Sequence, residues 1–209
     1  MIMQNNKDVS ACVYSITGIR LLKNLISKDF NFKNIYASKE DSQENLTEIR
    51  QITSSCSLNL VLLDSSDSIN LFEAKSDKVN TSCLLLLWWP YILKKRTINL
   101  FDYILNIHPS LLPFGRGKYG YFWSIINSEP FGVTIHLVDE GIDSGRILAQ
   151  KIISVEDTDT AGELYQKGVE YCILLFDEAI EDVINGLDLA HKHSYNSVNS
   201  DGSYHNIKD

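Results

Sequence analysis

The stretch VSACVYSITGIRLLKNLISK, residues 9–28, changes from the pattern of a strand to that of a helix. Its first part, residues 9–15, is a short apolar run, which is typical of a buried strand. From residue 18 to residue 28 the apolar side chains recur at the spacing of one helix face: Ile19, Leu22, Leu25 and Ile26. A strand followed at once by a helix is the repeating unit of a parallel sheet.

The same alternation continues along the chain. Strands are predicted at 34–38, 58–63, 83–88 and 102–107, and a polar, weakly amphipathic helix at 42–54. Strands that alternate with helices predict an α/β fold, with a mostly parallel sheet flanked by helices. Such sheets place their ligands at the carboxyl ends of the strands.

Beyond Pro109 the pattern changes. We expect a constrained loop at 111–118 and a short aromatic helix at 119–127. A hairpin should follow, with strands at 131–138 and 146–154 around an acidic loop at 139–145.

A long final helix is predicted at 161–185, because its apolar residues recur at helical spacing. Thr160 and Glu163 form a capping box at its start, and Gly186 supplies a stop. We assign residues 1–187 to one catalytic domain. Residues 188–209 are read as a polar tail, disordered or loosely attached from Ser194 onward.

Composition excludes several classes of partner. The chain has 209 residues, 44% of them hydrophobic, and a net charge of −8. This acidity disfavours nucleic acid and anionic membranes as partners, since both need a basic face. The polar start and the shortness of the longest apolar run, 84–89, lead us to expect a cytoplasmic protein. The four cysteines form no CxxC pair, so no metal site is expected.

Asn106 and His108 end an apolar strand and are two residues apart, so their side chains leave the same side of it. They can converge on one ligand atom at the rim of the sheet. Taken alone, an Asn-x-His is better explained by a histidine that caps the strand end and hydrogen-bonds nearby backbone.

The loop Asp139-Glu140-Gly141-Ile142-Asp143-Ser144-Gly145 carries three carboxylates. It could form a solvated turn, bind calcium or line an active site. The spacing lacks the alternate ligands and closing glutamate of an EF-hand, which argues against calcium.

Taken together, three segments resemble the folate-dependent formyltransferases: NIHPSLLP at 106–113, GVTIH at 132–136 and VDEGIDSG at 138–145. The resemblance is strong over about residues 83–187. It implies a Rossmann-like sheet and a catalytic trio of Asn106, His108 and Asp143. Asn106 and His108 would stabilise the oxyanion, and the imidazole would shuttle the proton with help from Asp143.

The resemblance also implies a co-substrate, N10-formyltetrahydrofolate, and no metal. The segment LLWWPYIL at 86–93 is similar to the family's pteridine-pocket wall. We therefore expect cofactor-binding residues at Trp88, Tyr91, Ile92 and Leu93, with Asp139 and Glu140 on the other side. For the tryptophans, ordinary core packing is an equal alternative.

The acceptor amine is harder to infer. The stretch LLPFGRGKY at 111–119, with Trp123, looks most like the nucleotide-sugar N-formyltransferases. This implies a nucleotide-linked amino sugar as substrate, and it is compatible with a homodimer. The predicted substrate-binding residues are Ser15, Arg116, Gly117, Lys118 and Tyr119.

Two alternatives stay open. Glycinamide ribonucleotide formyltransferases usually have a glycine-rich phosphate loop after the first strand, where this chain has only Gly18. A folate-binding module with little activity is the other. We expect His136 to be a structural or supporting residue, and the histidines at 191, 193 and 205 to be solvated.

Overall fold

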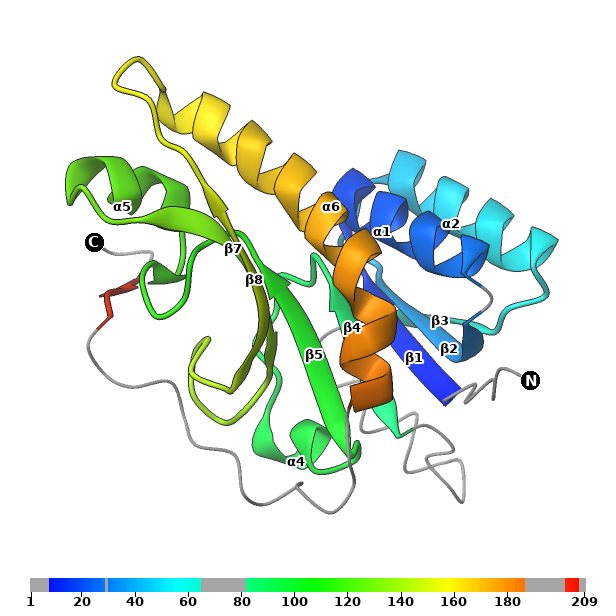
Figure 1. The fold of residues 1–209 in the computed structure, drawn as a ribbon. Coiled ribbons are helices and arrows are strands. Elements are labelled where there is room, and N and C mark those ends of the chain that lie inside the picture. Colours follow the sequence, from blue (N-terminus) through cyan, green and yellow to red (C-terminus); the bar gives the residue numbers. More distant parts are fainter. Residues whose placement is uncertain (1–7, 29, 65–81, 187–201, 207–209) are drawn as a thin grey trace, which may run out of the picture. The chain divides into compact units, whose positions relative to one another are not determined.

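The computed structural model describes residues 8–28, 30–64, 82–186 and 202–206 (Figure 1). The chain divides into two compact units, residues 1–106 and 107–209, and each is described by itself. Within the described residues, no helix is both long enough and apolar enough to cross a membrane.

Seven strands form the main sheet, in the order β3-β2-β1-β4-β5-β7-β8. Their bounds are β1 (Asp8–Val13), β2 (Asn31–Ser38), β3 (Leu60–Leu63), β4 (Cys83–Leu87), β5 (Tyr103–His108), β7 (Phe131–Leu137) and β8 (Ile147–Ile153). The pairs among β1 to β5 are parallel, and β8 runs antiparallel to β7. This confirms the predicted α/β fold with its mostly parallel, Rossmann-like sheet.

In unit 1, helices α1 (Ser15–Ser27) and α2 (Gln43–Ser55) contact each other and the strands. Ile19, Leu22 and Leu25 of α1 are fully buried, as the helical spacing predicted. Ile26, predicted on the same face, is only half-buried, and Leu21, which was not predicted there, is fully buried. The Ser42 hydroxyl caps α2 by accepting from the Asn45 N–H at 3.1 Å. A short helix, α4 (Lys95–Ile98), precedes β5.

In unit 2, the antiparallel hairpin of β7 and β8 carries α6 (Ala161–Gly186) packed against both strands (Figure 1). The capping box forms: Glu163 Oε2 accepts from the Thr160 N–H at 2.8 Å, and Thr160 Oγ1 accepts from the Glu163 N–H at 3.3 Å. The short aromatic helix is α5 (Gly120–Ile126), which contacts α6.

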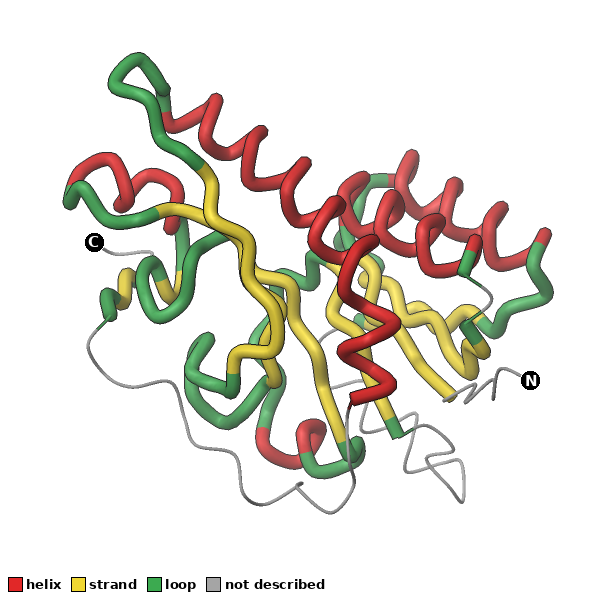
Figure 2. The backbone as a smooth tube through the Cα atoms, viewed as in Figure 1, coloured by secondary structure: helices red, strands yellow, loops and turns green. Residues whose placement is uncertain are grey.

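Part of the predicted tail is ordered structure. Strand β9 (Tyr204–His205) pairs in parallel with β6 (Arg116–Gly117), far earlier in the chain (Figure 2). For residues 202–206 the prediction of a loosely attached tail is therefore wrong. The rest of the predicted tail, with the histidines at 191 and 193, lies outside the described residues.

Candidate active site

The end of β5 presents two polar side chains. His108 is the last residue of the strand and is buried, with 8% of its surface exposed. Asn106 lies two residues earlier on the same strand and is half-buried. Because a strand alternates its side chains, both residues project from the same face.

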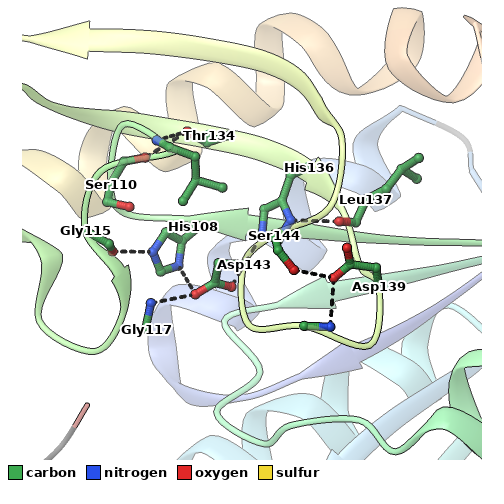
Figure 3. A network of polar contacts seen from close by, with 12 residues as sticks. His108, Ser110, Gly115, Gly117, Thr134, His136, Leu137, Asp139, Asp143 and Ser144 are labelled. Atoms are coloured by element: carbon green, nitrogen blue, oxygen red, sulfur yellow. Dashed lines mark hydrogen bonds and ion pairs between the residues drawn. The ribbon is translucent and has the colours of Figure 1, made fainter. Parts of the chain in front are cut away.

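His108 is held at both ring nitrogens (Figure 3). Its Nε2 lies 3.1 Å from the carbonyl oxygen of Gly115. A carbonyl can only accept, so Nε2 carries the hydrogen of this bond. Nδ1 faces Asp143 Oδ2 at 3.6 Å, which is ion-pair distance but longer than a hydrogen bond. With the hydrogen on Nε2, Nδ1 carries the lone pair of the neutral ring and faces the carboxylate.

Asp143 is held in place by its loop and by one backbone donor. Its φ of 47° lies in the left-handed region, which aspartate tolerates better than most residues. Oδ2 accepts from the Gly117 N–H at 2.9 Å, and the side chain is only 15% exposed. Left-handed backbone of this kind is often found at functional sites, and here it belongs to the residue that faces the imidazole.

The Asp143 carboxylate is kept charged. Burial by itself raises the pKa of this group, but several neighbours favour the charged form. The two nearby imidazoles, the Gly117 N–H and the Arg116 guanidinium outweigh burial. The pKa of Asp143 consequently lies below its ordinary value of 3.8.

The acidic loop is a turn held by internal hydrogen bonds. Asp139 Oδ1 accepts from the Gly141 N–H at 3.0 Å and from the Ser144 hydroxyl at 2.7 Å (Figure 3). A Cβ on Gly145 would lie 1.8 Å from the Leu137 carbonyl oxygen, so this position needs glycine. These contacts hold the loop in the conformation that presents Asp143. Among the described residues, no group of three metal-ligating side chains could hold an ion.

His136 lies beside Asp143, at the carboxylate oxygen that does not face His108. Its Nε2 is 3.6 Å from Asp143 Oδ1, and its Nδ1–H donates to the Leu137 carbonyl at 2.8 Å. Burial is the main cause that lowers the pKa of His136, and the Asp143 carboxylate opposes this without reversing it. His136 is therefore held neutral beside a charged carboxylate. The sequence signals for this residue were its alternation with Thr134 and its place at the end of the GVTIH segment at 132–136.

A buried network around Thr134 fixes the loop that follows β5. Thr134 Oγ1 donates to the Ser110 carbonyl at 2.8 Å and accepts from the Leu112 N–H at 3.1 Å. The Gln150 amide also donates to it, at 3.0 Å, and to the Leu112 carbonyl, at 2.7 Å. The backbone after His108 is thus tied to both strands of the hairpin.

The predicted substrate-binding residues are divided between the units. In unit 2, Arg116 and Gly117 form β6 and contact the site through Asp143, while Lys118 and Tyr119 are exposed. In unit 1, Ser15 begins α1 with φ 61°, and its N–H donates to Asp41 Oδ2 at 2.7 Å. The first amide of α1 therefore already holds a carboxylate.

The predicted cofactor-binding residues on the LLWWPYIL segment belong to unit 1. Trp88 follows β4 with φ 62°, and Ile92 is 69% exposed, whereas Leu93 is buried. The Tyr91 hydroxyl donates to Glu40 Oε2 at 2.6 Å. In unit 2, Asp139 holds the acidic turn and Glu140 is exposed. Cofactor binding at these positions stays a prediction.

The model of the formyl transferase family matches residues 23–175 of this chain. Two curated relatives illustrate its range. The chain is 46% identical over 77 residues to a GDP-perosamine N-formyltransferase of Brucella melitensis, which covers 36% of this chain and 30% of the relative. It is 34% identical over 143 residues to a methionyl-tRNA formyltransferase of Thermodesulfovibrio yellowstonii, which covers 66% and 46%. The chain thus spans less than half the length of these relatives.

Solved structures share the fold. A sugar N-formyltransferase from Shewanella has a TM-score of 0.71 at 22% identity, covering 97% of this chain and 78% of that one. An N-formyltransferase from Helicobacter canadensis, in complex with folinic acid and dTDP-3-aminofucose, has 0.70 at 24% identity, covering 97% and 71%. Glycinamide ribonucleotide transformylase 1 from Symbiobacterium toebii has 0.73 at 18% identity, covering 88% and 92%.

Proposed function

Because this chain belongs to the formyl transferase family, we propose that it transfers a formyl group from N10-formyltetrahydrofolate to the amine of a nucleotide-linked amino sugar. The observation that carries the proposal is the His108–Asp143 pair at the end of β5, two residues after Asn106. A base backed by a carboxylate, beside an amide donor, suits acyl transfer to an amine.

The chemistry follows from these groups. The neutral amine attacks the formyl carbon, a carbon–nitrogen bond forms, and the carbonyl oxygen becomes an oxyanion that the Asn106 amide can stabilise. His108 Nδ1 takes the proton lost by the amine, and Asp143 stabilises the resulting imidazolium at 3.6 Å. The same proton then passes to N10 as the bond from carbon to N10 breaks, which releases tetrahydrofolate and the formamide.

An amino sugar is favoured over glycinamide ribonucleotide by the start of α1. An anion bound there would compete with the Asp41 carboxylate, which accepts from the Ser15 N–H at 2.7 Å. Asp41 is 6% exposed and also accepts from the Ser42 N–H and the Asn45 amide, so it is firmly held. A ribonucleotide phosphate would have to displace it. The relative that acts on GDP-perosamine adds support for a sugar acceptor.

The test is a product assay with N10-formyltetrahydrofolate and a panel of GDP-, UDP- and dTDP-linked amino sugars, with glycinamide ribonucleotide and buffer as further arms. We expect tetrahydrofolate release and a formylated sugar by mass spectrometry. His108→Gln should lower kcat by about 10² to 10⁴ without loss of folded structure in circular dichroism. Turnover of glycinamide ribonucleotide alone would replace the proposed acceptor. Formate release without an acceptor would mean hydrolysis, and folate binding without turnover would mean a binding module.

A further inference from the structure

Residues 202–206, which we call the strap, are bonded along the loop that follows Pro113. The Arg116 N–H donates to the Ser203 carbonyl at 3.1 Å, and the Lys118 N–H donates to the His205 carbonyl at 3.2 Å. The Gly115 N–H donates to Ser203 Oγ at 2.7 Å. Three backbone donors of one short loop are therefore satisfied by the strap.

Side chains fix the strap further. The His205 ring stacks on the Trp123 indole with centroids 4.2 Å apart and planes 9° apart. The Ser203 hydroxyl donates to Glu129 Oε2 at 2.6 Å while it accepts from Gly115. One serine oxygen thus joins the loop to the segment before β7, and an aromatic stack anchors the other end of the strap.

The two backbones approach so closely that only glycine fits at two positions. A Cβ on Gly117 would lie 2.2 Å from the His205 carbonyl oxygen, and one on Gly202 would lie 2.0 Å from the Pro113 carbonyl oxygen. Both contacts are with backbone atoms, which cannot swing aside as a side chain can. The close packing of the loop against the strap therefore needs a glycine in each of them.

The same loop holds both members of the catalytic pair. The Gly115 carbonyl accepts from His108 Nε2, and the N–H of that residue is the one bonded to Ser203. The Gly117 N–H donates to Asp143 Oδ2, and its two neighbours, Arg116 and Lys118, donate to the strap. Each catalytic group is thus one hydrogen bond away from a residue that the strap holds.

We propose that the strap positions His108 and Asp143 for formyl transfer, and that Ser203 is a positioning residue of this enzyme. The strap fixes the loop, the loop fixes the imidazole through Gly115 and the carboxylate through Gly117, and the strap itself touches no reacting atom. Release of the strap frees the loop to shift. A displacement of about 1 Å in such a pair is enough to cost about 10²-fold in rate. The catalytic part of this inference rests on the proposed function.

The decisive pair of variants is Gly202→Ala and Gly186→Ala. The first places a methyl group against the Pro113 carbonyl, while the second, at the end of α6, meets no atom within 4 Å. We expect Gly202→Ala to lower kcat by about 10- to 100-fold with KM for both substrates nearly unchanged, and Gly186→Ala to match the wild type. Equal kcat in the two variants, with both folded, would overturn the proposal.

Ser203→Ala covers the case in which Gly202→Ala fails to fold. It removes the acceptor of the Gly115 N–H without a clash, so kcat should fall while Ser203→Thr, which keeps the hydroxyl, restores it. Ser55→Ala, an exposed serine at the end of α2, is the matched control. Loss in Ser203→Ala with no recovery in Ser203→Thr would count against a role for the hydroxyl.

A readout that does not need turnover separates the two proposals. The side-chain nitrogen resonances of His108, assigned with His108→Gln, should shift in Gly202→Ala and in Ser203→Ala but not in the two controls. If the resonances shift while no amine is formylated, the strap positions the pair and the proposed function is wrong. If formyl transfer is found and the resonances and kcat stay unchanged, the strap inference is wrong.

Discussion

The Asp143 carboxylate lies 3.6 Å from His136 Nε2 through its oxygen Oδ1. Its other oxygen lies at the same distance from His108 Nδ1. The two imidazoles differ in environment, because His136 is almost completely buried and burial lowers its pKa. His136 is thus kept neutral, and the charge of Asp143 is available to His108. A carboxylate flanked in this way can stabilise one imidazolium without being neutralised by a second.

The buried state of His136 predicts how stability depends on pH. Its folded-state pKa lies below the ordinary value of 6.5, so below pH 6.5 the unfolded chain binds a proton that the folded chain resists. The stability that the neutral His136 contributes is fully present above pH 6.5, and it is lost as the pH falls toward the lowered folded pKa. The free energy of unfolding of the wild type should therefore fall once the pH drops below 6.5, measured as the shift in urea midpoint between about pH 7.5 and about pH 5.5.

His136→Gln removes the group that gains a proton, so the urea midpoint of this variant should fall less than that of the wild type over the same pH interval. The amide keeps a polar group in the buried position, and His136→Asn repeats the test with a shorter side chain. The comparison is a difference between two pH values within each protein, so a uniform loss of stability in the variant does not affect it. Parallel pH profiles in wild type and variants would contradict the assignment.

Asp143→Asn separates charge from shape. The amide oxygen can still accept from the Gly117 N–H, but the negative charge that faces His108 Nδ1 is gone. We expect kcat to fall by about 10² to 10⁴, measured by tetrahydrofolate release. Asp182→Asn, an exposed carboxylate on α6, should keep wild-type turnover. An active Asp143→Asn enzyme would remove the carboxylate from the mechanism.

The same substitution has a consequence in acid. Because the pKa of Asp143 is lowered in the folded protein, its charge contributes stability above the ordinary value of 3.8. That contribution is lost as the pH falls through the lowered folded pKa. Asp143→Asn should therefore flatten this part of an acid-unfolding curve, followed by circular dichroism, while Asp182→Asn should retain the wild-type slope.

Thr134→Val tests the network behind the site. Valine fills the same space, but the Ser110 carbonyl and the Leu112 N–H lose their partner in a buried position. Leaving such groups unsatisfied costs about 1 to 3 kcal/mol, which should appear in urea denaturation. Thr47→Val makes the same change on the exposed surface of α2 and should stay within about 0.5 kcal/mol of the wild type. Equal stabilities would show that the network contributes little.

The α/β fold could be predicted from the sequence because buried parallel strands appear in it as apolar runs. Residues 83–88 were predicted and β4 spans Cys83–Leu87. Strand β2 was predicted from residue 34 but begins at Asn31, because its first residues are mostly polar and mask the pattern. These first residues pair with β1, as Asp8 with Asn31 shows. Pairing partners of this kind are invisible to a periodicity argument.

Within the candidate site, spacing and motif placed Asn106 and His108 at a strand end and Asp143 in the acidic loop. The contact of His136 with Asp143 depends on the conformation of the loop between β7 and β8. A local sequence pattern does not predict that conformation. The strap was missed for a related reason. Strands β6 and β9 each have two residues and lie far apart in sequence, so neither carries a hydrophobic period. The sequence therefore indicated the candidate catalytic side chains, but not the contacts that hold them in place.

The cofactor prediction at Ile92 can be tested without disturbing the core, because this side chain is 69% exposed in unit 1. An apolar residue left in solvent at a position matched to the pteridine wall has no packing to lose. A charge there should instead repel a flat heterocycle that needs an apolar contact. Ile92→Asp should therefore raise KM for N10-formyltetrahydrofolate and leave kcat at saturation close to wild type.

Ile152→Asp supplies the matched control, since Ile152 on β8 is 73% exposed and receives the same change in size and charge. Both variants should melt near the wild-type temperature, because an exposed isoleucine contributes little to the core. Only Ile92→Asp should need more folate for half-maximal turnover. A raised KM in both variants would indicate a general effect of added negative charge on an anionic co-substrate. An unchanged KM in both would exclude the Ile92 side chain from the folate site.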